Sequence, residues 1–169
     1  MKRFKTDKQE SFKSKYSRLF FNLFPAIRGT GGWVSFISDD WRELHIRLPL
    51  SWRTRNYVGT VFGGSIYAST DPFYMVQLIK ILGEAYIVWD KSATIKFKRP
   101  IKQSVYARFL ITDEILHEIK DNVKAHGFYT IELPILLQDK QEIVYAEIIK
   151  TIYIADKTFY QERKKKHIK

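Results

Sequence analysis

The sequence predicts a single α+β domain in which one long helix lies against a curved antiparallel sheet. Two observations carry this prediction. Residues 56–83 form the one long segment whose apolar residues repeat with a helical period. Nearly all of the chain after that segment alternates apolar and polar residues, as strands with one buried and one solvated face do. With 169 residues, of which 45% are hydrophobic and 15% aromatic, the chain has enough apolar material for one packed core.

The helix expected over residues 56–83 has four apolar residues on one face, namely Met75, Leu78, Ile79 and Leu82. One turn earlier the same face includes Asp71, so we expect this carboxylate to point inward. Pro72 leaves a second possibility open, in which Asp71 caps a shorter helix that begins at the proline. Gly63 and Gly64 open the segment and would let the backbone approach a ligand closely.

An amphipathic helix is expected near the N-terminus, over residues 8–24. Asp7 and Glu10 have the spacing of a capping box. Apolar residues follow at helical intervals, at Phe12, Tyr16, Leu19, Phe20 and Leu23. Pro25 ends this helix, and a glycine-rich turn follows. Two placements fit a basic amphipathic helix: packing on the body of the domain, or lying on a membrane surface.

Strands are expected on both sides of the central helix. Their ranges are 34–37, 41–48, 86–99, 105–118, 128–137 and 142–154. Pro134 suggests that the fifth of them lies at an edge or contains a bulge. Short hairpin connections in the second half of the chain favour an antiparallel sheet.

The formal net charge of +11 is concentrated at the two ends of the chain. Residues 1–18 and 157–169 each carry +5, which leaves +1 for the residues between them. We divide the chain into a basic N-terminal segment with the amphipathic helix (1–29), a central domain (30–156) and a basic C-terminal tail (157–169). The tails either are solubilising and disordered or make weak contact with an acidic membrane surface. Nucleic acid is not an expected partner, because the body lacks a basic stripe.

The residue types exclude several kinds of chemistry. The chain has no cysteine, which rules out disulfides and thiolate chemistry and is compatible with the reducing cytoplasm, where we expect the protein to be. No apolar run follows the N-terminus as in a signal peptide, and none reaches the roughly 18 residues of a membrane span. The four histidines show no metal-ligand spacing, so we expect neither a metal nor another cofactor.

The element order and the residues at its centre resemble the hotdog fold, and more narrowly the branch of the thioesterase superfamily related to phenylacetyl-CoA thioesterase. That branch has an Asn, a short loop, a His-Gly-Gly, six residues, and then an Asp or Glu on the central helix. This chain has Asn56, then Phe62-Gly63-Gly64, then SIYAST and Asp71. The segments TDPFYMVQL and YIVWDKSATIKFKRP also look like an uncharacterised family within the same superfamily.

The resemblance implies an acyl-CoA thioesterase-like protein, in which coenzyme A is present only as part of the substrate. It implies Asp71 as the general base or nucleophile, and the backbone N–H of Gly64 as the donor that polarises the thioester carbonyl. Physical chemistry supports both roles. The first N–H groups of a helix have no internal partner and suit a developing oxyanion, and a carboxylate in a partly dry cleft can activate water.

Further residues are expected to contact the substrate around these two groups, namely Asn56, Phe62, Gly63, Ser65, Tyr67 and Tyr74. The three aromatic residues among them would line an apolar acyl channel. Asn56 and Ser65 also suit purely local roles, in the turn and in close packing. Lys98 and Arg99 are candidates for the phosphates of coenzyme A, although their alternation equally fits a solvated strand face.

The resemblance also implies a homodimer or a dimer of dimers, with residues 86–99 at the interface between subunits. One departure from the family pattern keeps a second function open. Phe62 stands where the family has His, so an apolar wall replaces a polar group beside the thioester. The alternative is therefore a non-catalytic protein of the same fold that binds an acyl-CoA or fatty-acyl ligand.

Overall fold

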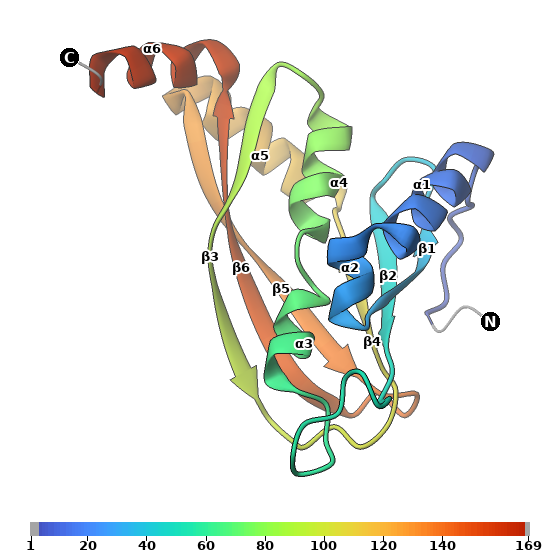
Figure 1. Ribbon diagram of the computed structural model, residues 1–169. Coiled ribbons are helices and arrows are strands. Elements are labelled where there is room, and N and C mark those ends of the chain that lie inside the picture. The colour runs from blue at the N-terminus through green and yellow to red at the C-terminus, as the bar shows by residue number, and fades with distance from the viewer. Residues whose placement is uncertain (1–3, 168–169) are drawn as a thin grey trace.

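The structure of the protein is a computed structural model, which describes residues 4–167. Its helices are α1 (Phe12–Leu23), α2 (Pro25–Thr30), α3 (Gly63–Ala68), α4 (Phe73–Leu82), α5 (Asp113–His126) and α6 (Lys157–His167). Its strands are β1 (Trp33–Ile37), β2 (Glu43–Leu48), β3 (Tyr86–Phe97), β4 (Val105–Leu110), β5 (Phe128–Gln138) and β6 (Val144–Asp156). The α+β class is confirmed, because one curved sheet wraps around α3 and α4 (Figure 1).

The sheet is antiparallel and has the order β1-β2-β4-β5-β6-β3. This order makes β1 and β3 the two edge strands. The inward-facing residues of the strands form one core with the central helices, including Leu44, Ile46, Leu48, Phe109, Ile131, Leu133, Ile135, Ile148, Ile152 and Ile154. The predicted alternation of buried and solvated residues is thus confirmed for β4, β5 and β6. Among residues 4–167, no helix has both the length and the apolar character needed to cross a bilayer.

The prediction of one continuous central helix is wrong. The helical segment stops at Ala68 and resumes at Phe73, because Pro72 has no N–H to donate to the preceding turn. The buried residues of α4 are Phe73, Tyr74, Gln77 and Leu78. Ile79, which was expected on the inner face, is 42% exposed.

Asp71 does not cap α4, so the alternative prediction for this residue is also wrong. The residue at the cap position is Pro72, and no side chain bonds the first N–H groups of the helix. The Asp71 carboxylate instead accepts a hydrogen bond from Lys150 of β6. The break between α3 and α4 therefore frees Asp71 for an interaction with the sheet.

The strand predicted over residues 105–118 is half wrong. β4 ends at Leu110, and α5 begins at Asp113. Thr112 caps this helix by accepting a hydrogen bond from the Ile115 N–H. Leu116, Ile119 and Val123 are buried along one face of α5. The capping residue and this helical spacing are present in the sequence, but the alternation of β4 leads directly into them and hides the change of period.

Pro134 lies inside β5, between β4 and β6, so the expected edge position is wrong. The register shift in this strand comes later, between Leu137 and Gln138. Within residues 4–167, β4 pairs with β5 only at Tyr106 and Gln138. Most of β5 therefore has no hydrogen-bonded neighbour on its β4 side. Pro134, which has no N–H to donate, is tolerated in such a position.

The C-terminal tail is not a disordered segment as far as the structure describes it. α6 follows β6 directly, and Phe159 stacks on Phe128 with ring centroids 5.9 Å apart. Gly127 ends α5 with a left-handed φ of +78°, and a Cβ placed there would lie 2.4 Å from the Phe159 ring. Gly127 is thus required both by its backbone conformation and by the docking of α6.

Replacing Gly127 with alanine is expected to lower the free energy of unfolding by about 2 kcal/mol or more, since the left-handed backbone and the overlap with Phe159 both add cost. Gly59→Ala is the matched control, because Gly59 has a similar φ of +82° but no atom within 4 Å of the added Cβ. We expect it to cost only about 1 kcal/mol. Urea denaturation of both variants tests this prediction. Adding Phe159→Ala to the Gly127→Ala variant should recover part of the lost free energy of unfolding, because it removes the overlap. Equal losses in the two variants would contradict a steric role for Phe159.

Candidate functional site

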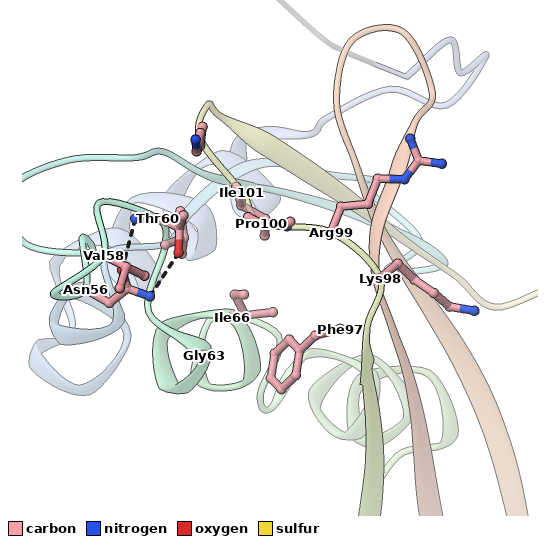
Figure 2. Close-up of a pocket in the computed structure, with 12 residues that line it drawn as sticks. Asn56, Val58, Thr60, Gly63, Ile66, Phe97, Lys98, Arg99, Pro100 and Ile101 are labelled. Atoms are coloured by element: carbon pink, nitrogen blue, oxygen red, sulfur yellow. Dashed lines mark hydrogen bonds between the residues drawn. The ribbon is translucent and has the colours of Figure 1, made fainter.

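The first turn of α3 borders an open cleft of about 500 Å³ (Figure 2). Its walls come from the loop that leads into α3 and from the end of β3 with the residues after it. The lining residues are Asn56, Val58, Thr60, Val61, Gly63, Ile66, Phe97, Lys98, Arg99, Pro100, Ile101 and Lys102. The structure therefore brings the loop of Asn56, the glycine pair and the strand of Lys98 and Arg99 to one place, although they are far apart in sequence.

Two aromatic rings cover the glycines at the start of α3. A Cβ on Gly64 would lie 2.3 Å from the Phe62 ring, and one on Gly63 would lie 3.2 Å from the ring of Phe97. Both rings are more than half exposed, Phe62 at 57% and Phe97 at 58%. The glycines thus allow two solvent-facing rings to lie against the helix start. Of these rings, Phe97 lines the cleft, whereas Phe62, which was predicted to line the acyl channel, does not.

The first amides of α3 belong to Gly63, Gly64 and Ser65, which have no intrahelical partner because they open the helix. The preceding residue is fixed, since the Phe62 N–H donates to the Thr54 carbonyl at 2.7 Å. This hydrogen bond fixes the orientation of the backbone where it enters α3, next to the cleft. An amide held in this way can donate to a carbonyl oxygen without first reorganising.

Asn56 is occupied with its own loop. Its Nδ2 donates to Thr60 Oγ1, and its Oδ1 accepts from the Thr60 N–H, each at 2.9 Å (Figure 2). Its backbone N–H also donates to the Thr60 carbonyl at 2.7 Å. Asn56 thus shapes the wall of the cleft, and its side chain serves the local backbone.

Lys98 and Arg99 line the cleft mainly with their backbone. Both side chains extend away from Ile66, from the Phe97 ring and from the cleft between them (Figure 2). Lys98 Nζ forms an ion pair with Glu147 Oε2 at 3.0 Å. The structure therefore places neither of these two cationic groups inside the cleft.

The predicted channel residues Tyr67 and Tyr74 do not line this cleft. Tyr74 is buried in the core, where its hydroxyl donates to the Pro134 carbonyl at 3.0 Å. Burial raises the pKa of Tyr74 to about 12. Tyr67 is part-exposed and lies over Lys150, whose Nζ is 5.3 Å from the ring centroid.

Asp71 is the outer member of a charge cluster that we call the Lys150 cluster, formed by Asp71, Asp90 and Lys150. Lys150 Nζ is 2.6 Å from Asp71 Oδ1 and 3.0 Å from Asp90 Oδ2. The lysine side chain is 2% exposed, whereas that of Asp71 is 43% exposed. Solvent therefore reaches the Asp71 carboxylate, while the cation that holds it in place is buried beneath.

A bulge in β3 brings Asp90 into this cluster. The β3–β6 register shifts between Asp90 and Ser92. Val88 and Asp90 face inward before the shift, and Ala93 and Ile95 face inward after it. The extra residue at the bulge re-aims the strand, so that Asp90 and Ala93 lie on the same side of the sheet.

The electrostatics of the cluster are asymmetric. Burial raises the pKa of Asp90, and the nearby Asp71 carboxylate raises it further, while Lys150 acts in the opposite direction. Burial alone would lower the pKa of Lys150, but its bonds to Asp71 and Asp90 outweigh that effect and raise it. The lysine thus keeps its proton and supplies a fixed positive charge beneath Asp71.

Lys150 and Asp90 were not among the residues expected from the sequence, although a signal for Lys150 was present. The apolar face of β6 is formed by every second residue, at positions 144, 146, 148, 152 and 154. Lys150 occupies the remaining position on that same face. A lysine on a buried strand face requires a partner of opposite charge. Asp90 carries a weaker signal, because a polar Asp-Lys-Ser interrupts the alternation of β3 just where the bulge forms.

The chemical possibilities of the arrangement follow from its two parts. The α3 end offers amide donors in an apolar cleft, and the Lys150 cluster offers an accessible carboxylate. Asp71 does not line the cleft, and it lies past the C-terminal end of α3, in the break before α4. In the part of the chain that the structure describes, no group of three His, Cys, Asp or Glu side chains could hold a metal ion.

Comparison with known proteins gives a family and a set of similar structures. A family model described as "Domain of unknown function (DUF4442)" matches residues 13–154. No curated protein matches the sequence significantly. Among solved structures, a Pseudomonas aeruginosa protein described as a "Probable Thioesterase" of unknown function has 16% identity and a TM-score of 0.73, with 84% of this chain and 95% of that chain covered.

Two further structures are similar over most of their length. A thioesterase from Haemophilus influenzae has 14% identity and a TM-score of 0.62, with 89% of this chain and 96% of that chain covered. A protein of unknown function from Chlorobaculum tepidum has 18% identity and a TM-score of 0.65, with 84% and 93% covered. At these identities the likeness concerns the fold, which is the hotdog fold, as the sequence resemblance implied.

Proposed function

The chain belongs to the DUF4442 family and has the hotdog fold, and from this premise we propose that it is an acyl-CoA thioesterase-like protein that hydrolyses an acyl thioester. The observation that carries the proposal is Asp71, a solvent-accessible carboxylate that a buried lysine holds at 2.6 Å. An accessible carboxylate anchored in this way is preorganised to act on a bound substrate.

In the proposed reaction Asp71 acts as general base toward water. The water oxygen bonds to the thioester carbonyl carbon, while its proton moves to the Asp71 carboxylate. The amide N–H of Gly64 donates to the carbonyl oxygen as that oxygen becomes negative. The carbon–sulfur bond then breaks, and the thiolate of coenzyme A leaves and takes up the proton. The products are a carboxylic acid and free coenzyme A.

We propose that a second copy of the chain completes the site. Gly64 and Asp71 lie at opposite ends of α3, and only the glycine end opens into the cleft. β3 is an edge strand, and its exposed Trp89 and Phe97 give that edge an apolar character. A homodimer, or a dimer of dimers, joined along β3 would bring the Asp71 of one protomer toward the cleft of the other. The phosphates of coenzyme A would then lie at the rim, near Arg99.

A second function is favoured by Phe62. Its ring packs over Gly64, whose amide would hold the carbonyl oxygen. An apolar ring at this place suits retention of an acyl chain as well as its turnover. The alternative is a protein that binds an acyl-CoA or fatty-acyl ligand without hydrolysing it.

Thioester hydrolysis over a panel of acyl-CoA substrates of increasing chain length tests the proposal. We expect turnover that rises with chain length, because the cleft mouth and floor are apolar. Release of free coenzyme A is the readout, and binding of the same ligands is measured by calorimetry. Saturable binding without turnover at any chain length would establish the binding function in its place. Neither binding nor turnover would exclude both.

A further inference from the structure

α1 is packed on the domain with its polar side, and its apolar side faces solvent. Its buried residues are Ser14 and Asn22. The apolar residues of the helix that were expected to follow one face do so, but they point outward, at Phe12, Tyr16, Leu19, Phe20 and Leu23. We call these five residues the α1 stripe, and each is between 53% and 86% exposed. The amphipathic pattern is thus inverted relative to a helix that packs on a core.

The polar side of α1 holds this orientation by capping the edge of the sheet. The Asn22 side chain accepts a hydrogen bond from the Val34 N–H at 2.8 Å and donates to the Val34 carbonyl at 2.9 Å. It therefore stands in for a neighbouring strand at the β1 edge. On the same side, the Phe21 ring meets Phe73 of α4 edge-on, with centroids 6.0 Å apart.

The segment before α1 is fixed as well. Glu10 pairs with Arg18 at 2.8 Å and accepts a hydrogen bond from the Ile37 N–H at 3.1 Å. Thr6 donates to Glu43 Oε2 at 2.8 Å. Turning the helix to bury its stripe would break these bonds and leave the β1 edge unpaired. The stripe is therefore a permanent feature of this surface.

The charges around the stripe are positive. Lys13 and Lys15 are exposed and, at 100° per residue, lie on opposite sides of the stripe. Lys5, which precedes the helix, is exposed as well. A second copy of this face would bring equal positive charges together, which is unfavourable. An anionic surface would instead be attracted to both borders of the stripe.

We propose that the α1 stripe docks on an anionic lipid surface, with the helix axis parallel to the bilayer. The five apolar side chains would enter the boundary between headgroups and acyl chains, and the lysines would extend to the lipid phosphates. Figure 1 shows α1 at the β1 edge of the sheet, with α6 beyond the opposite end of the molecule. The contact is therefore made by α1 and the chain before it, and the basic C-terminal helix takes no part.

Co-sedimentation of the full chain with vesicles tests this proposal. We expect binding to vesicles of phosphatidylcholine with phosphatidylserine that is at least about tenfold tighter than to phosphatidylcholine alone, and that weakens as salt is added. Leu19→Ser/Phe20→Ser should lower the affinity by about tenfold or more, because it removes two apolar anchors. Both side chains are more than half exposed, so the melting temperature should fall by no more than about 5 °C.

Two charge-matched variants separate the α1 surface from the overall basicity of the chain. Lys13→Glu/Lys15→Glu is expected to lower vesicle affinity by about tenfold or more. Lys164→Glu/Lys165→Glu makes the same change in net charge on exposed residues of α6, and it should leave the affinity within about twofold if α1 makes the contact. Equal losses in the two variants, or no vesicle binding by the unmodified chain, would overturn the proposal. So would a change of oligomeric state in Leu19→Ser/Phe20→Ser, measured by analytical ultracentrifugation, since a second copy would then be the occupant of the stripe.

Discussion

Asp71→Asn is expected to lower thioester turnover by about 100-fold or more, because the amide cannot accept the proton of the attacking water. The substitution keeps the size of the side chain. Lys150 retains Asp90 as a partner at 3.0 Å, so the fold should tolerate the change. Steady-state release of coenzyme A from the best substrate of the panel is the measurement.

Asp90→Asn is the control for this experiment. It removes a carboxylate from the same lysine, but at a strand position that is less accessible than Asp71. We expect Asp90→Asn to keep most of the turnover. If the two variants lose activity equally, the integrity of the Lys150 cluster matters, and Asp71 is not itself the base. If Asp71→Asn keeps full turnover, another group activates the water.

Lys150→Met is expected to lower the free energy of unfolding by roughly 3 kcal/mol at neutral pH, because it leaves two carboxylates beside an apolar strand face without their cation. Methionine is of similar length and fills the space of the lysine stem. Lys140→Met, at an exposed position in the turn after β5, is the matched control and should be nearly neutral. Urea denaturation at pH 7 measures both.

The free energy of unfolding lost in Lys150→Met should depend on pH in a definite direction. The pKa of Asp90 is raised in the folded protein, so the folded state binds this proton more tightly than the unfolded chain does. Asp90 therefore weakens the fold as the pH rises from about 4, its unfolded value, through its folded pKa. Without Lys150 that cost grows, and it disappears when the carboxyl is protonated. The loss caused by Lys150→Met should thus be largest at pH 7 and shrink toward pH 4.

The dependence of stability on alkaline pH provides a second check. The pKa of Lys150 is raised in the folded state, so the stability that the lysine contributes is present below about pH 10.4 and is lost as the pH rises through the folded pKa.

A double variant provides a third check. Asp90→Asn in the Lys150→Met background should recover part of the stability at pH 7, since it removes the less accessible uncompensated charge. A loss that does not depend on pH, or no recovery in the double variant, would mean that Lys150 stabilises the fold through packing alone.

Much of the fold follows from the sequence, because half-buried strands carry a period of two that survives in a single sequence. For this reason the alternation of apolar and polar residues indicated strands at β2, β4, β5 and β6. The glycine pair at the start of α3 was also visible, since a backbone that must approach another group closely requires residues without a Cβ. The structure adds what it approaches, namely the rings of Phe62 and Phe97.

Tertiary structure decided the features that depend on partners from distant parts of the chain. The sequence places Asp71 before a proline, but only the fold puts Lys150, 79 residues later, within 2.6 Å of it. The sequence likewise shows that α1 is amphipathic, but not which side faces the domain. There the hydrogen bonds of Asn22 to the β1 edge prevail over burial of the apolar side, because an unpaired strand edge offers directional partners that the apolar residues cannot satisfy. Local periodicity thus determined the elements, and long-range polar contacts decided how they are oriented.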